Sequence, residues 1–364
     1  MPIWVLVLAA LLTLVFFAVA HVLFWSWIYR VLPQQDELRF GRTQDGWEVA
    51  LARRKPRAAP RLPPVLLCHG LAANRANLDF GIDRYSVSLF LAKAGFDCFA
   101  LDLRGHGATR RARKDAPRRW TFDTYLRQDI PAALDEIRAA TGQEQVLWVG
   151  HSQGALLGLA AAAADPSRLA GVVAMAPPTH FAAQNELRRL LRYSFLATGR
   201  HRWLVRGASP LAGYLHPSFA QFALNTRNVD PRISRQLMAN VVEDISPGVL
   251  AQFLEWARTD VFVSEDGKVD YRSGLASARA PALFIAGAQD LLAPPAAVEA
   301  GFALWGGEKE LWVAGRNAGL GADYGHSDLI FGRNAQEEIF PKVRDWLLQR
   351  SSAGGVLEGL PQKP

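Results

Sequence analysis

Cysteine is nearly absent from the chain, which holds only Cys68 and Cys98 among its 364 residues. Two thiols build neither a disulfide framework nor a zinc cluster, so we expect both to be buried core residues. The sequence also lacks a P-loop, a dinucleotide-binding fingerprint and a cluster of metal ligands. These absences predict a protein that works without a metal or another cofactor.

Charged side chains are missing from the start of the chain, because residues 2–29 contain no Asp, Glu, Lys or Arg. About 20 apolar residues suffice for a helix to cross the hydrocarbon core of a bilayer. This run ends in the aromatic residues expected at a membrane surface, namely Trp25, Trp27 and Tyr29. We predict that residues 1–30 form a transmembrane anchor. A signal peptide cleaved after Ala20 is the alternative, although the run lacks a basic start and continues past that residue.

Acidic residues are scarce in two basic runs. Residues 53–61 hold five Lys or Arg and no acid, and residues 104–119 hold seven against one Asp. No nucleic-acid motif accompanies these runs, so nucleic acid is not an expected partner. Lys and Arg begin only after residue 29, and the positive-inside rule then predicts a single-pass protein with a cytoplasmic domain. Signal cleavage would instead make it secreted or periplasmic. We expect both runs to lie against anionic headgroups.

Short apolar runs bounded by turn residues predict the strands of a sheet. Residues 37–55 predict two strands around a turn at Asp45–Gly46. Six further strands are predicted at 65–70, 96–105, 145–150, 171–178, 282–287 and 310–315. Helical patterns lie at 84–94, 121–140, 152–164 and 335–349. Continuous apolar strands that alternate with helices predict an α/β fold, with a parallel sheet covered on both faces.

The alternation is interrupted between residues 179 and 280, which are rich in Arg, Leu, Phe and Trp. A mostly helical insertion of this size favours a cap, and caps commonly shield a reaction from water. A helical layer without a role in binding is the alternative. Residues 37–178 and 281–350 then form the core, and residues 351–364 are typical of a disordered tail.

The segment Gly150-His151-Ser152-Gln153-Gly154 matches the pattern G-x-S-x-G. A predicted strand precedes it and a helix-forming run follows it, which is the setting of a nucleophile elbow. The turn is tight, so a side chain at Gly150 or Gly154 would collide with neighbouring backbone. Ser152 is therefore the predicted nucleophile, and a structural serine turn is the alternative.

A serine hydroxyl needs a base, which is usually a histidine oriented by a carboxylate. His326 follows the last predicted strand, whereas the other histidines after Ser152 fall in the predicted cap; these are His180, His201 and His216. Asp290 lies just past a predicted strand, at the edge where α/β sites form. We predict His326 as the base and Asp290 as the acid. The rival acids are Asp260, Asp323 and Asp328.

Two backbone N–H groups should face the negative charge that develops on the substrate oxygen. One should belong to Gln153, directly after the predicted nucleophile, and the other to Leu71, in the loop after the strand at 65–70. Three histidines near the predicted site are expected to have structural roles, and these are His69, His106 and His151.

Five segments in this order resemble the α/β-hydrolase superfamily: CHGLAANRANLDF, FDCFALDLRGHG, GHSQG, AGAQDLLAPP and YGHSDLIFG. Within it the chain is most similar to acid-lipase-like and lysophospholipase-like serine hydrolases. The resemblance covers residues 37–350 and implies an eight-stranded, mostly parallel sheet, a cap after the sixth strand and serine esterase or lipase chemistry. It carries over Ser152, Asp290 and His326, with the backbones of Leu71 and Gln153 as the oxyanion hole.

The leading hypothesis is a membrane-anchored serine hydrolase that cleaves an apolar acyl ester through an acyl-enzyme. The anchor and the many aromatic residues favour a lipid-like substrate. One alternative is an acyltransferase with the same triad, in which an alcohol replaces water. Another is a non-catalytic membrane scaffold, because a fold does not imply a function.

Overall fold

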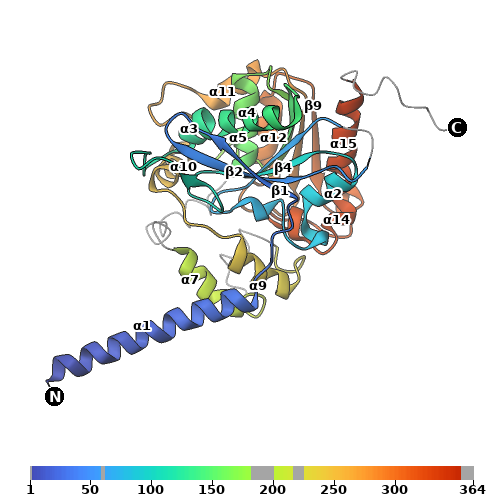
Figure 1. Ribbon diagram of the computed structural model, residues 1–364. Helices are drawn as coiled ribbons and strands as arrows, with labels where there is room; N and C mark the ends of the chain where they lie inside the picture. The colour runs from blue at the N-terminus through green and yellow to red at the C-terminus, as the bar shows by residue number, and fades with distance from the viewer. Residues whose placement is uncertain (1, 59–61, 182–200, 216–224, 354–364) are drawn as a thin grey trace.

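A mixed nine-stranded sheet forms the centre of the molecule, and helices cover both of its faces (Figure 1). The computed structural model describes residues 2–58, 62–181, 201–215 and 225–353. Its strands are β1 (Glu37–Arg42), β2 (Trp47–Arg54), β3 (Val65–Cys68), β4 (Cys98–Asp102), β5 (Arg110–Arg111), β6 (Val146–His151), β7 (Leu169–Met175), β8 (Ala282–Gly287) and β9 (Lys309–Ala314).

The strand order is β1-β2-β4-β3-β6-β7-β8-β9, and β5 pairs with β2 beside this path. β1 and β2 form the predicted antiparallel hairpin, β2 is antiparallel to β4, and every pair from β4 to β9 is parallel. The predicted eight-stranded, mostly parallel sheet is thus confirmed, with the two-residue β5 as an addition. The carboxyl ends of the parallel strands share one edge, which is where α/β proteins place their sites.

The core strands are buried on both faces, as their unbroken apolar sequences predict. Every residue of β3, β4, β6 and β8 is buried, and Cys68 and Cys98 are free thiols within this core.

Helices flank the sheet on both faces (Figure 1). They are α2 (Val87–Lys93), α3 (Phe122–Thr124), α4 (Ile130–Thr141), α5 (Gln153–Ala164), α12 (Pro295–Leu304), α13 (Asp328–Phe331), α14 (Ala335–Glu338) and α15 (Phe340–Ala353). A π-helical turn, η3 (Tyr125–Asp129), joins α3 to α4. The strand–helix pattern did not predict α12, which begins at a proline suited to a first helical position.

The segment between β7 and β8 has two parts with different neighbours. The helices α7 (His201–Ala208) and α9 (Pro231–Asn240) contact each other, and the 3₁₀ turn η5 (Ser209–Leu211) contacts both. Further along, α10 (Pro247–Thr259) contacts α3, and α11 (Tyr271–Gly274) contacts α5 and α12. The C-terminal part of the predicted insertion at 179–280 therefore packs with the helices of the core.

The first helix, α1 (Ile3–Ile28), projects away from the sheet (Figure 1). In the described part of the chain it is the one helix long and apolar enough to cross a membrane. None of its residues is fully buried, and α7, α9 and η5 contact it. The described residues of the domain therefore leave most of α1 exposed.

Two cations of the basic runs lie inside the protein. Arg54 pairs with Asp79, and Arg104 lies 2.6 Å from Asp45 and 2.7 Å from Asp129. Arg54 is 1% exposed and Arg104 is 0% exposed. The expectation that both runs lie against headgroups is therefore wrong at these two residues, because buried guanidinium groups cannot reach a lipid.

The start of the predicted tail is also helical. α15 continues to Ala353, and the buried Ser351 hydroxyl donates to the Leu347 carbonyl. The prediction of disorder for 351–364 is thus wrong at its beginning. Residues 354–364 lie outside the described part.

Candidate active site

Ser152 stands alone between β6 and α5, in a strained backbone conformation. Its φ of 54° and ψ of −116° fall outside the regions that a residue with a side chain readily adopts. The Ser152 N–H donates to the Met175 carbonyl at 2.8 Å, and the Ser152 carbonyl accepts from the N–H of Ala155 at 3.0 Å. The turn is thus held from both sides, and it places the partly exposed Ser152 at the carboxyl edge of the sheet.

The structure shows why the motif needs glycine at two positions, since no side chain would fit there. A Cβ atom on Gly150 would lie 2.3 Å from the Gly154 carbonyl oxygen. A Cβ atom on Gly154 would lie 2.1 Å from the Cys68 carbonyl oxygen at the end of β3. Both contacts are with backbone, which cannot rotate away. The predicted collision at either glycine is confirmed.

Asp290 and His326 meet although 36 residues separate them in the chain. Asp290 follows β8, and its Oδ1 accepts from the N–H groups of Leu292 and Ala293 at 2.8 Å each. Its Oδ2 lies 2.7 Å from His326 Nδ1, and both residues are buried. A carboxylate oxygen accepts, so this contact favours the tautomer with its proton on Nδ1 and leaves Nε2 free.

His151 connects the serine turn to the His326 loop. Its Nε2 lies 3.1 Å from the His326 carbonyl oxygen, and the two rings are 4.7 Å apart between centroids. Within the described ranges no hydrogen bond joins Ser152 Oγ to His326. Such bonds are often long in unliganded enzymes and tighten when substrate is present. The structure therefore joins Asp290 to His326 and places Ser152 beside a residue that touches His326.

The rival carboxylates have other partners. Asp328 Oδ2 accepts from the Gly325 N–H at 2.8 Å and from Asn228 at 2.7 Å, and burial raises the pKa of this carboxyl. Asp323 accepts from the Arg316 N–H, and Asp260 accepts from Phe181 N–H and Arg272. Asp328 thus fixes the loop that carries His326, while Asp290 contacts its imidazole.

The histidines of the predicted cap lie elsewhere. His180 contacts the Thr179 hydroxyl, and His201 lies 3.5 Å from Asp244. His216 falls outside the described residues. Neither of the two described histidines contacts Asp290, which leaves His326 as its partner.

Two backbone N–H groups near Ser152 lack an acceptor in the described part of the chain. They belong to Leu71, after β3, and to Gln153, in the first turn of α5, where helix N–H groups have no partner within the helix. A Cβ atom on Gly70 would lie 3.3 Å from Ser152 Cβ, so the loop of Leu71 runs directly beside the serine. Both N–H groups suit a developing oxyanion.

The insertion after β7 holds this loop in place. The Glu243 N–H donates to the Ala72 carbonyl at 2.9 Å, and the Asn74 N–H donates to the Val241 carbonyl at 3.1 Å. Ala72 has a φ of 57°, which costs energy for a residue with a side chain. The segment at 241–243 thus stabilises a strained loop beside Ser152.

The other buried histidines are unprotonated, and among them His69 hydrogen-bonds to backbone groups. His69 Nδ1 lies 2.8 Å from the Gly70 carbonyl, and its Nε2 accepts from the Leu103 N–H. Burial lowers the pKa of His69 to about 3, and it also lowers the pKa values of His106 and His151. These imidazoles are therefore neutral at physiological pH. The contacts of His69 and His151 fit the structural roles expected of them.

Asn77 is a site residue that the sequence patterns did not reveal. Its Oδ1 accepts from the Gly70 N–H at 3.1 Å and lies 3.1 Å from His151 Nδ1. One buried side chain thus connects the Leu71 loop to the serine turn. An asparagine in a polar loop carries no local signal of such a role, because its partners come from other strands.

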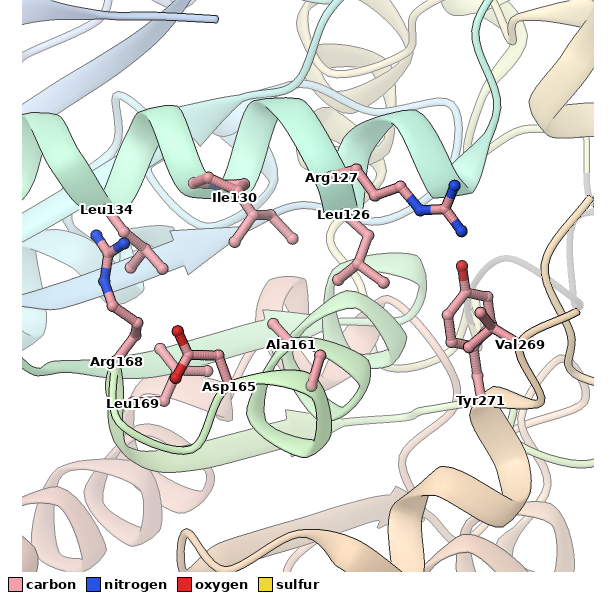
Figure 2. A pocket seen from close by; sticks show the side chains of 12 residues that line it. Leu126, Arg127, Ile130, Leu134, Ala161, Asp165, Arg168, Leu169, Val269 and Tyr271 are labelled. Atoms are coloured by element: carbon pink, nitrogen blue, oxygen red, sulfur yellow. The ribbon is translucent and has the colours of Figure 1, made fainter. Parts of the chain in front are cut away.

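A cavity of about 320 Å³ lies away from these residues (Figure 2). Leu126, Ile130 and Leu134 face Ala161 across it, and Tyr271 stands near one end. Neither Ser152 nor His326 lines this space, because Ala161 lies toward the other end of α5. The cavity is therefore separate from the candidate site. The described residues also contain no group of three or more potential metal ligands.

A strand–serine–helix turn on a mostly parallel sheet, with an aspartate and a histidine on later loops, defines a class of proteins. The chain belongs to the alpha/beta hydrolase fold family, whose model matches residues 63–314. Human lipase member K is 29% identical over 223 residues, which are 58% of this chain and 53% of that protein. Lysosomal acid lipase/cholesteryl ester hydrolase of Macaca fascicularis is 34% identical over 149 residues, which are 37% of each chain.

These relatives confirm the resemblance to acid lipases, and the chain spans between 37% and 53% of their length. Among solved structures, a membrane phospholipase A described as a bacterial virulence factor has a TM-score of 0.57 at 18% identity. The match covers 97% of this chain and 99% of that one. It shows a common fold.

Proposed function

We propose that this chain is a serine hydrolase that cleaves carboxylic esters with an apolar acyl chain. The observation that carries the proposal is the buried Asp290–His326 hydrogen bond beside the strained turn of Ser152. Relatives that are named as lipases support the same reaction class and an apolar substrate.

In the proposed reaction, His326 Nε2 takes the proton of Ser152 Oγ while the oxygen attacks the ester carbonyl carbon. The N–H groups of Leu71 and Gln153 stabilise the oxyanion of the tetrahedral intermediate. The intermediate collapses as His326 returns the proton to the leaving alcohol, and an acyl-serine remains. His326 then takes a proton from water as the water oxygen attacks the acyl carbon, and it returns that proton to Ser152 Oγ as the second intermediate collapses, which releases the carboxylic acid and free Ser152. Asp290 stabilises the imidazolium that forms in both halves.

Ser152→Ala should lower kcat for p-nitrophenyl butyrate by about 10⁴-fold or more, because the acyl-enzyme can no longer form. Labelling by a fluorophosphonate should disappear as well. Ser277→Ala is the matched control, because this exposed hydroxyl donates to the Gly274 carbonyl. Persistent labelling of the Ser152→Ala protein would show that another residue is the nucleophile.

We also propose that α1 is an uncleaved single-pass anchor with the catalytic domain on the cytoplasmic side. Its apolar length, its terminal aromatic residues and the Lys and Arg that follow it support this orientation. Protease added to sealed cells should leave the domain intact, whereas protease added to inverted membrane vesicles should digest it. Digestion in sealed cells would contradict the orientation.

The described part of the insertion before α10 is, in this proposal, the cap over the site. Its support is the contact that residues 241–243 make with the loop of Leu71, through the Glu243–Ala72 and Asn74–Val241 hydrogen bonds. A cap fixed to this loop would shield the reacting ester from water.

A further inference from the structure

An exposed apolar surface lies on α7, η5 and the turn that follows them. We name it the α7 patch, and it consists of Trp203, Leu204, Leu211, Tyr214 and Leu215. Leu204 is 74% exposed and Tyr214 is 73% exposed, values unusual for side chains of this size in water. Large apolar side chains exposed together on one short segment mark a contact with another apolar phase.

The α7 patch adjoins the apolar helix α1. Both α7 and η5 contact α1, and the two helices lie side by side (Figure 1). His21 Nε2 of α1 lies 2.9 Å from the Gly207 carbonyl of α7. A Cβ atom on Gly207 would lie only 3.2 Å from the Val22 side chain, so the glycine permits this close approach.

The crossing point sets the depth of α7 in a bilayer. A helix rises about 1.5 Å per residue, so His21 lies about 12 Å before Tyr29 along the axis of α1. If Trp25, Trp27 and Tyr29 mark the membrane surface, Gly207 lies at the boundary between headgroups and acyl chains. Helices that lie in the plane of a membrane surface are buried to about 5–10 Å. His21 lies about 6 Å before Trp25 and about 12 Å before Tyr29, so the position of α7 overlaps that range.

Arginine side chains lie beside the aromatic residues of the patch, as they do on helices that lie at a membrane surface. Arg202 and Arg206 lie 5.5 and 5.7 Å from the Trp203 ring, and Arg235 lies 4.3 Å from the Tyr214 ring. Residues 201–215 contain no Asp or Glu. In the described part of the domain, Glu243 and Asp244 pair with Arg202 of α7 and hold it against the protein. Aromatic residues with adjacent arginines are typical of surfaces that meet anionic lipid.

We propose that the α7 patch is a second membrane-contact surface, which inserts into the leaflet from which α1 emerges. Its occupant is a bilayer that contains anionic lipid. The inference rests on the proposed membrane anchor, and it adds a second point of attachment that prevents the domain from rotating about α1. The same insertion bonds to the loop of Leu71 through residues 241–243, so the candidate site is held at a defined height above the lipid.

Fluorescent probes on single introduced cysteines test this arrangement in the full-length protein. Both native thiols are fully buried, so a new surface thiol is the one that reacts. Leu204→Cys and Leu215→Cys report on the patch. Leu304→Cys is the matched control, because this leucine of α12 is 38% exposed and lies on the core. Phe16→Cys reports on α1. The labelled proteins are reconstituted in phosphatidylcholine–phosphatidylglycerol vesicles with brominated acyl chains.

Probes at 204 and 215 should be quenched severalfold more than the probe at 304, and the probe at 16 should be quenched strongly. Quenching at 16 without quenching at 204 and 215 would overturn the inference and leave the anchor standing. Absence of quenching at 16 would overturn both. Probes at 204 and 215 that are shielded from water but not quenched by brominated lipid would indicate a second copy of the chain, which also overturns the inference.

A variant that introduces two negative charges into the patch tests the consequence for catalysis. Leu204→Glu with Leu215→Glu should lower hydrolysis of vesicle lipid about tenfold and leave turnover of p-nitrophenyl butyrate in detergent unchanged. Equal loss on both substrates, or loss on neither, would overturn the role of the patch. The probe measurements do not depend on turnover, so a failure of the proposed hydrolase activity is distinguishable from a failure of the patch.

Discussion

At the scale of single residues, the orientation of Asp290 is decided by its hydrogen bonds. The N–H groups of Leu292 and Ala293 hold one carboxylate oxygen, which directs the other to His326 Nδ1. Asp328 is equally buried and two residues from His326, yet backbone and asparagine donors occupy its oxygens. Proximity in the chain is therefore a poor guide to which carboxylate orients an imidazole.

Asp290→Asn should lower kcat for p-nitrophenyl butyrate by about 10⁴-fold, because an amide N–H facing Nδ1 selects the tautomer with a proton on Nε2. His326 then cannot accept the proton of Ser152. Asp323→Asn is the matched control and should keep activity within a few fold, since Asp323 contacts the Arg316 N–H. Equal activity in the two variants would remove Asp290 from the mechanism.

At the scale of elements, the last residue of α9 joins three segments. Asn240 Nδ2 donates to the Tyr29 carbonyl, and its Oδ1 accepts from the Val31 N–H at 3.0 Å. Its own carbonyl accepts from the Asn74 side chain at 2.8 Å. The chain that leaves α1 is thus tied to the insertion, and the insertion is tied to the loop beside Ser152.

Asn240→Ala should loosen the connection between α1 and the domain, because the Tyr29 carbonyl and the Val31 N–H lose their partner. The loss of such a pair costs about 1–3 kcal/mol, so tryptic cleavage after the exposed Arg30 should accelerate about tenfold or more. Asn334→Ala, at an exposed asparagine 3.5 Å from Glu338, should leave that rate unchanged. An unchanged cleavage rate in Asn240→Ala would show that the Asn240 hydrogen bonds do not hold the junction between α1 and the domain.

At the scale of the whole molecule, three buried histidines stay unprotonated in the folded protein at pH values where the unfolded chain would bind a proton at each of them. Burial lowers the pKa values of His69, His106 and His151. The unfolded chain binds protons at these residues below about pH 6.5, and the folded protein does not. Their contribution to stability is therefore complete above that pH and is lost as the pH falls toward the folded value, about 3 for His69.

The melting temperature should accordingly fall by several degrees between pH 7 and pH 5.5, and change little between pH 7 and pH 8. Each histidine contributes at most about 1.4 kcal/mol per pH unit. Asp129, whose pKa burial raises to about 6, opposes this with at most one proton. Thermal unfolding of the full chain in detergent measures the change. A melting temperature that rises as the pH falls to 5.5 would contradict the assignment.

Local pattern predicted most of the sheet because its strands are short, apolar and bounded by turn residues. It missed β5, whose sequence Arg110–Arg111 has no strand character and is extended because it pairs with Trp47 and Glu48 of β2. It also treated Arg54 and Arg104 as surface charges. Their partners Asp79, Asp45 and Asp129 lie in other segments, so only the packed fold shows that these cations are neutralised inside.

The sequence by itself determined the fold class and the serine turn, because both depend on neighbours within a few residues. Glycines on either side of Ser152, a strand before it and a helix after it are local features. The tertiary structure decided which carboxylate meets His326, which side chain ties the Leu71 loop to the serine turn, and where α7 lies along α1. These are contacts between distant segments, and their geometry is set by how strands and helices pack rather than by any short run of residues.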